Sequence, residues 1–115
     1  MTKDRVSAVL VHADAFLTQQ FGQIAALALK NKLPTIGPYS EYVEAGGLMC
    51  YGQNPAEQAR QAATYVDKIL KGAKPADLPV EQPTRFELVI NMKSAETLGL
   101  KFPQSILIQA TKVIE

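Results

Sequence analysis

Apolar and polar residues follow one another along the chain in blocks that predict strands and helices in turn. Residues 6–11 form a continuous aliphatic and β-branched run, typical of a strand covered on both faces. Residues 18–31 carry apolar side chains at helical spacing, and residues 33–37 predict a second short strand. Strand, helix and strand within about 30 residues predict a right-handed βαβ unit.

The middle of the chain carries the clearest helix signal. Residues 38–45 predict a loop with one helical turn, and residues 48–51 predict a third strand. Asn54, Pro55 and Glu57 suit the cap, first-turn and capping-box positions of a helix that we expect to end at Gly72. We expect the apolar side of this helix to face the core through Ala59, Ala62, Ala63, Val66, Ile69 and Leu70.

The remaining residues predict a connection, a strand and two short helices. Three prolines stiffen residues 73–83, and residues 85–92 alternate as a strand with one buried face, made of Phe86, Leu88, Ile90 and Met92. Ser94 is expected to cap a helix ending at Gly99, and Pro103 to begin a last helix to about residue 112. The sum is an α/β fold: a three-layer, mostly parallel sheet with flanking helices in a flavodoxin-like arrangement.

Composition narrows the class of protein. The chain has 115 residues, 47% of them hydrophobic, and a net charge of +1, which argues against a disordered chain and against an electrostatic nucleic-acid binder. No apolar run approaches the ~20 residues that span a bilayer. A single cysteine and a single histidine exclude an internal disulfide and a zinc cluster. We expect no cofactor and no metal.

The N-terminus has a faint likeness to a signal peptide. Its apolar stretch, residues 6–11, is shorter than the usual ~7–15 residues, and His12 interrupts it. We therefore favour a first strand, and expect a chain that, as written, lacks a signal peptide and stays in the cytoplasm.

Candidate chemistry gathers where three predicted strands end. Ligands of open α/β sheets bind beyond the carboxyl ends of the strands, which selects the loops at residues 12–16, 38–41 and 50–54. The candidate ligand-binding residues in and beside these loops are Asp14, Ala15, Phe16, Tyr39, Glu41, Cys50 and Tyr51. The sequence contains no phosphate loop, Rossmann fingerprint, nucleophile elbow or CxxC motif, so we expect no enzyme and no catalytic residue.

Each candidate also has a structural interpretation. Asp14 could receive an ammonium or hydroxyl group of a ligand, or could cap the following helix and tighten the turn. Phe16 could line a pocket or pack in the core, and Glu41 suits a solvated loop charge. Cys50 lies in an apolar strand and suits an inert core residue, while His12 has no partner nearby in the sequence.

An ordered series of short motifs resembles one family over nearly the whole chain from Val6. The motifs are Asp14-Ala-Phe16, Gln23-Ile-Ala-Ala-Leu-Ala28, Leu33-Pro34, Glu44-Ala-Gly-Gly-Leu-Met49, Tyr51-Gly52, Ala62-Ala-x-Tyr65, residues 69–84, Phe86-Glu-Leu-Val-Ile-Asn91, Leu98-Gly-Leu100 and Phe102-Pro103. The chain resembles the substrate-binding proteins of ABC importers, in the group that contains tryptophan and tyrosine binders.

The resemblance implies a periplasmic-binding-protein-like fold, in which two α/β lobes close on a solute. It covers only the C-terminal portion of such proteins, with a partial ligand-binding lobe at residues 1–80 and a hinge strand and C-terminal helices at residues 81–115. The family's aspartate falls on Asp14, and cleft contacts fall near Tyr39, Cys50 and Tyr51. Full-length members are periplasmic or lipid-anchored and deliver solute to an ABC permease.

Three functions follow as alternatives. The first is a solute-binding component of an ABC importer, or a fragment of one, that binds a solute such as an aromatic amino acid. The second is a small flavodoxin-like enzyme or regulator, and the third is an assembly module without a ligand. Because a partial lobe exposes sheet edges, we expect a homodimer or higher oligomer, with exchange of the strand at residues 85–92 or of the C-terminal helices.

Overall fold

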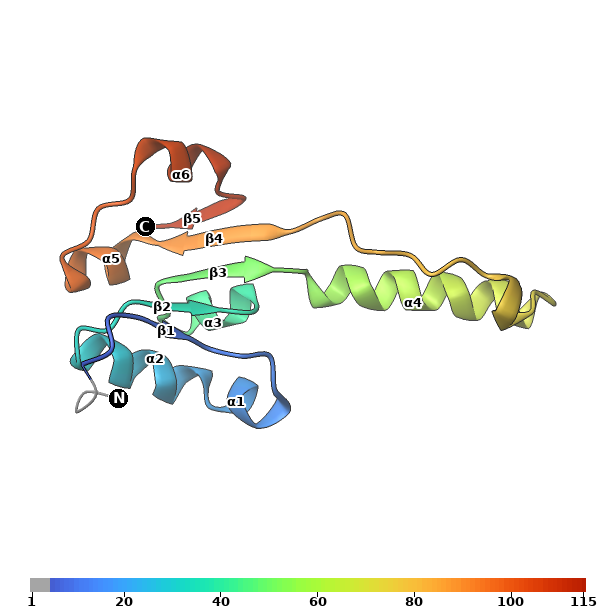
Figure 1. Cartoon of the computed structure of the whole chain (residues 1–115), viewed down its shortest axis with the longest axis horizontal. Helices are drawn as coiled ribbons and strands as arrows, with labels where there is room; N and C mark the ends of the chain where they lie inside the picture. Colours follow the sequence, from blue (N-terminus) through green and yellow to red (C-terminus); the bar gives the residue numbers. More distant parts are fainter. Residues whose placement is uncertain (1–4) are drawn as a thin grey trace.

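A five-stranded sheet forms the body of the molecule, with its strands in chain order (Figure 1). The computed structural model describes residues 5–115. The strands are β1 (Val9–Leu10), β2 (Thr35–Gly37), β3 (Met49–Gly52), β4 (Glu87–Asn91) and β5 (Lys112–Ile114). Neighbouring strands are parallel except for the antiparallel pair β3 and β4. The predicted α/β fold with a mostly parallel sheet and flanking helices is confirmed.

Helices connect the strands and follow the sequence signals closely. They are α1 (Ala15–Gln19), α2 (Phe21–Lys30), α3 (Ser40–Glu44), α4 (Pro55–Leu70), α5 (Met92–Leu98) and α6 (Gln104–Gln109), with a 3₁₀ turn, η2, at Pro75–Asp77. The predicted helix at residues 18–31 is divided at Gln20 into α1 and α2. No helix among residues 5–115 is long and apolar enough to cross a membrane. Residues 1–4 of the stretch weighed as a signal peptide lie outside the described range.

The core lies on one face of the sheet, under α2 and α3. Val11, directly after β1, packs with Phe21 and Ala25 of α2 and with Tyr42 of α3. The Tyr42 ring meets Phe21 edge-on at 5.3 Å between centroids, and its hydroxyl lies 2.5 Å from Thr35 Oγ1. This pairing satisfies two polar groups that burial would otherwise leave without a partner.

A second cluster of buried side chains joins the two halves of the chain. Val43 of α3 packs with Cys50 of β3 and Val89 of β4, and Ile114 of β5 lies against them. Two side chains tie the C-terminal part of the chain to α3 and to the loop that follows it. Asn91 Nδ2 donates to the Val43 carbonyl at 3.4 Å, and Ser94 Oγ donates to the Gly46 carbonyl at 2.8 Å.

Helix α4 differs most from expectation. It projects away from the sheet, with the chain returning alongside it (Figure 1), and none of its residues is buried. The expectation that its apolar side faces the core is wrong for the described residues. Asn54 caps the helix as predicted, because its Oδ1 accepts from the amides of Ala56 and Glu57 at 2.8 and 3.3 Å. Glu57, however, pairs with Arg60 rather than completing a capping box.

The C-terminal elements correct three further expectations. Strand β4 is buried through both Val89 and Ile90, because β3 and β5 flank it and each face is covered there, so it does not have a single buried face. Asn91, not Ser94, caps α5, since its Oδ1 accepts from the Ser94 amide at 3.1 Å. The last helix ends at Gln109, and β5 follows it where a longer helix was expected.

Candidate functional site

A small cavity opens where β1 and β2 end, at the edge of the sheet that the sequence selects. It has a volume of about 280 Å³. Residues from the ends of β1, β2 and β3 line it: Leu10, Val11, His12, Ala13, Ile36, Gly37, Pro38 and Tyr51. Most of these side chains are apolar, so the cavity suits the hydrophobic part of a small molecule.

Tyr51 provides the aromatic wall of this cavity. Its side chain is 57% exposed and stacks on Phe86 at 5.6 Å between ring centroids, with an angle of 16° between the planes. Phe86 precedes β4 and is itself 47% exposed, although its alternation with Leu88 predicts a buried position. Sequence reasoning missed Phe86 because only the register of β4 against β3 brings it beside Tyr51.

Asp14 follows the cavity-lining Ala13 directly and caps α1. Its Oδ1 accepts from the amides of Phe16 and Leu17 at 2.9 and 3.2 Å. The capping interpretation of Asp14 is therefore confirmed. Both bonds use the same oxygen, which leaves Oδ2 without a protein partner in the described part of the chain. A capping aspartate with one free oxygen can still accept a hydrogen bond from a ligand.

The other predicted site residues do not converge on the cavity. Ala15 begins α1, and the Phe16 side chain next to it is 68% exposed. Tyr39 occupies the cap position of α3 and packs partly against the core, while Glu41 lies exposed in the first turn of α3. Tyr51 alone among the seven candidates lines the cavity.

Cys50 is placed in the core. Its side chain is 1% exposed, and burial raises the pKa of its thiol to about 11, with the carboxylates of Glu87, Glu41 and Glu44 adding to the shift. A neutral, enclosed thiol is a poor nucleophile and a poor ligand. The interpretation of Cys50 as an inert core residue is confirmed, and we leave it out of the proposed ligand set.

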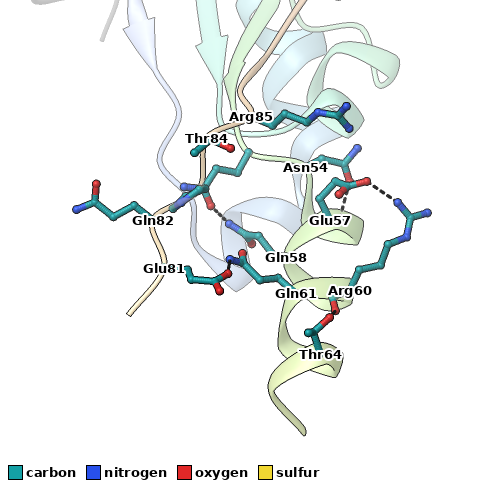
Figure 2. Close-up of a pocket in the computed structure, with 12 residues that line it drawn as sticks. Asn54, Glu57, Gln58, Arg60, Gln61, Thr64, Glu81, Gln82, Thr84 and Arg85 are labelled. Atoms are coloured by element: carbon teal, nitrogen blue, oxygen red, sulfur yellow. Dashed lines mark hydrogen bonds and ion pairs between the residues drawn. The ribbon is translucent and has the colours of Figure 1, made fainter. Parts of the chain in front are cut away.

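A larger cavity lies where α4 leaves the sheet and the chain returns alongside it (Figure 2). Its volume is about 580 Å³, and polar side chains from the first turns of α4 and from residues 81–85 line it. These side chains bind one another: Gln61 Nε2 donates to Glu81 Oε2 at 2.6 Å, Gln58 donates to Gln53, and Arg60 pairs with Glu57. Of these contacts, the bond between Gln61 and Glu81 joins α4 to the returning chain, and the other two lie within the first turns of α4 and the residues just before it.

Two further hydrogen bonds join α4 and its cap residue to the returning chain. Asn54 Nδ2 donates to Glu87 Oε1 at 2.8 Å, which joins the start of α4 to the start of β4. Tyr65 donates its hydroxyl to the Pro79 carbonyl at 2.6 Å near the far end of α4. No three potential metal ligands come together among residues 5–115.

Comparison with known proteins identifies the family. A family model described as ABC transporter substrate binding protein matches residues 1–114. The chain belongs to this family. No curated protein sequence matches the chain. The predicted family, the periplasmic-binding-protein-like α/β fold and the partial coverage of the fold are confirmed.

Three solved structures resemble this substrate-binding family member. A conserved domain protein from Vibrio cholerae is 29% identical, with a TM-score of 0.87 over 96% of this chain and 37% of its own. An ABC domain from Streptococcus pneumonia in complex with L-Trp is 31% identical, with a TM-score of 0.87 over 98% of this chain and 39% of its own. A ligand-free, open substrate-binding protein with adhesive properties from Clostridium difficile is 25% identical, with a TM-score of 0.65 over 93% of this chain and 36% of its own. The chain thus spans less than two fifths of the length of each relative.

Proposed function

We propose that this chain binds a small solute such as an aromatic amino acid, as part of the solute-binding component of an ABC importer. The observation that carries the proposal is the apolar cavity at the carboxyl ends of β1 and β2, in a chain that belongs to the substrate-binding family. The L-Trp complex of the streptococcal relative supports an aromatic solute.

The residues around the cavity suggest how such a solute would be held. The exposed ring of Tyr51, backed by Phe86, offers a flat apolar surface for an aromatic side chain. The free Oδ2 of Asp14 can accept a hydrogen bond from an ammonium group. We also propose that residues of the same loops contact the outer side of the bound solute: Ala15, Phe16, Tyr39 and Glu41. We propose that the chain binds the solute without converting it chemically.

Affinity for the isolated chain should be weak. A cleft that encloses a solute needs two walls, and the cavity here is open to solvent. One wall with a single aromatic surface and one carboxylate gives a dissociation constant on the order of millimolar.

The absence of tryptophan from the sequence makes a direct test possible. The fluorescence anisotropy of L-Trp should rise as the protein is added, and excitation at the red edge of tryptophan absorption avoids the signal of the four tyrosines. Asp14→Asn keeps the cap, because asparagine is as good an N-cap as aspartate, but removes the charge and should weaken binding several-fold. Asp67→Asn removes a charge from exposed α4 and serves as the matched control. Equal affinities for all three proteins would contradict the role of Asp14.

The proposal extends to the protein's partners. We propose that the complete receptor acts outside the cytoplasm and delivers solute to an ABC permease. We also propose that this chain self-associates when alone, because Leu10, Val66 and Leu70 are more than half exposed. Light scattering at micromolar concentration tests this, and a stable monomer contradicts it. We propose that copies of the chain associate by exchange of the strand at residues 85–92 or of the C-terminal helices.

A further inference from the structure

The small cavity at the ends of β1 and β2 is lined by one side chain that can carry a positive charge. His12 lies just beyond β1 and lines the cavity together with Ala13 and Tyr51. Among the described residues, no lysine or arginine lines this cavity, and apart from His12 and the Tyr51 hydroxyl its side chains are apolar. His12 is exposed, and it is the single histidine of the chain.

The proposed solute has one charged group that still lacks a partner. Tyr51, backed by Phe86, offers a surface for the aromatic ring, and Asp14 offers an oxygen to the ammonium group. An amino acid also carries an α-carboxylate, which loses water when it enters a mostly apolar cavity. A carboxylate in such a place requires a hydrogen-bond donor, and a charged donor stabilises it most.

The ring nitrogens of His12 show when it can donate to such a group. Its Nδ1 lies 3.4 Å from the Ala13 carbonyl oxygen. Because a carbonyl oxygen only accepts, the proton of this contact belongs to Nδ1, and Nε2 of the neutral ring carries a lone pair. The lone pair repels a carboxylate, whereas a protonated imidazole donates from Nε2 and adds a positive charge.

His12 and Asp14 are close enough to hold the two ends of one head group. They flank Ala13, so their Cα atoms are at most about 7.6 Å apart. An α-amino acid carries its ammonium and carboxylate groups on the same carbon. A head group that lies over Ala13 can therefore reach Asp14 with its ammonium group and His12 with its carboxylate.

The charges around His12 make its own charge decisive. The surrounding elements bring carboxylates and one phenol to this edge of the sheet: Asp14 before α1, Glu41 of α3, Tyr51 of β3 and Glu87 of β4. Arg85 lines the larger cavity beside α4 instead. While His12 is neutral, the small cavity offers a solute carboxylate only negative neighbours, and protonation of His12 supplies the attraction.

We propose that His12 binds the α-carboxylate of the solute and selects an amino acid over the corresponding amine. The inference rests on the proposed function, because it assigns the remaining group of the same solute. Imidazole gains a proton as the pH falls from about 8 to about 5.5, while an α-carboxylate stays ionised throughout this range. Affinity for an amino acid should therefore rise as the pH falls.

Fluorescence anisotropy with three indole compounds tests the assignment at about pH 8 and about pH 5.5. L-Trp carries both charged groups, tryptamine lacks the carboxylate, and indole-3-propionate lacks the ammonium group. L-Trp and indole-3-propionate should each bind roughly threefold more tightly at the lower pH, which is the size of an exposed charge pair. Tryptamine should gain no affinity, because a protonated His12 repels its ammonium group.

Two variants assign the effect to His12. His12→Gln keeps a polar side chain without a titratable ring, and the pH dependence of L-Trp binding should disappear. His12→Lys carries a positive charge at both pH values, so it should bind L-Trp at about pH 8 as tightly as wild type does at about pH 5.5. The only hydrogen bond of the exposed His12 side chain is to the adjacent residue, so both variants should keep the urea midpoint of wild type.

The outcomes separate this inference from the proposed function. L-Trp affinity that is equal at both pH values, a pH gain that persists in His12→Gln, or an equal gain for tryptamine would overturn the role of His12 while the solute site stands. If none of the three compounds raises its anisotropy at either pH, the solute site fails, and the role of His12 fails with it.

Discussion

Tyr42 is enclosed by two glycines, and substitution of either one should destabilise the fold. The ring is fully buried, and its hydroxyl and edge are held by Thr35 and Phe21. A Cβ added at Gly47 would lie 2.7 Å from Tyr42 Cζ, and one at Gly37 would lie 2.8 Å from Tyr42 Cβ. Both distances are below any ordinary carbon contact, so the ring or the backbone must move.

The expected magnitude for Gly47→Ala follows from these contacts. Overpacking of a filled core costs about 1–3 kcal/mol. Displacement of the ring also breaks the Tyr42–Thr35 hydrogen bond, worth about 1 kcal/mol. We expect a loss of roughly 3 kcal/mol in the free energy of unfolding, which lowers the thermal midpoint by on the order of 10–20 °C. That is a large part of the 5–15 kcal/mol that is usual for a small domain.

Urea denaturation followed by circular dichroism provides the measurement. Gly22→Ala is the matched control, because a Cβ at Gly22 meets nothing within 4 Å and alanine favours a helix interior by about 0.5–1 kcal/mol. In the double variant Gly47→Ala with Tyr42→Leu, the two effects should not add, since the smaller side chain relieves the clash. Equal urea midpoints for Gly47→Ala and wild type, or strict additivity in the double variant, would refute the reasoning.

Three further predictions concern the caps and the core thiol. Asn54→Ala removes the cap of α4 and the bond to Glu87, so the amides of α4 should exchange roughly fivefold faster, while the urea midpoint of the body stays unchanged because α4 is not packed on it. Asp14→Ala should cost about 1 kcal/mol in the free energy of unfolding through the lost α1 cap, and Asp14→Asn should restore it. The folded state raises the pKa of Cys50 from 9.0 to about 11, so it favours the neutral thiol. This contribution, on the order of 2–3 kcal/mol, is present below pH 9 and is lost as the pH rises toward 11. Cys50→Ser should flatten the alkaline decline in stability, and an unchanged profile would contradict the burial effect.

Local signals in the sequence predicted most elements well. Asn54 with Pro55 marked the start of α4, and Gly72 and Gly99 marked helix ends, where both glycines adopt positive φ. These predictions succeeded because a cap or a left-handed turn involves only neighbouring residues. The three-residue β5 was missed because so short a strand at the end of the chain is defined by its pairing with β4, which is not a local property.

The candidate site was predicted only in part for the same reason. The rule that ligands bind beyond the carboxyl ends of strands selected the edge of the sheet where the small cavity lies, and Tyr51 is the predicted residue that lines this cavity. It could not tell that Cys50 points into the core while Tyr51 points outward, because the alternation of side chains has a direction only once the sheet is packed. Phe86 joined Tyr51 through strand pairing across 35 residues.

By itself, the sequence determined the family, the α/β class and the positions of most helices and strands, because these depend on periodicity, caps and ordered motifs along the chain. Only the tertiary structure decided which apolar surfaces find a partner. The residues of α4 carry the pattern of a buried helix, yet none of them is buried, because periodicity along the chain does not specify which surface a helix packs against. The fold directs α4 away from the sheet (Figure 1), and that direction is set by contacts between segments far apart in the sequence, such as Asn54 with Glu87.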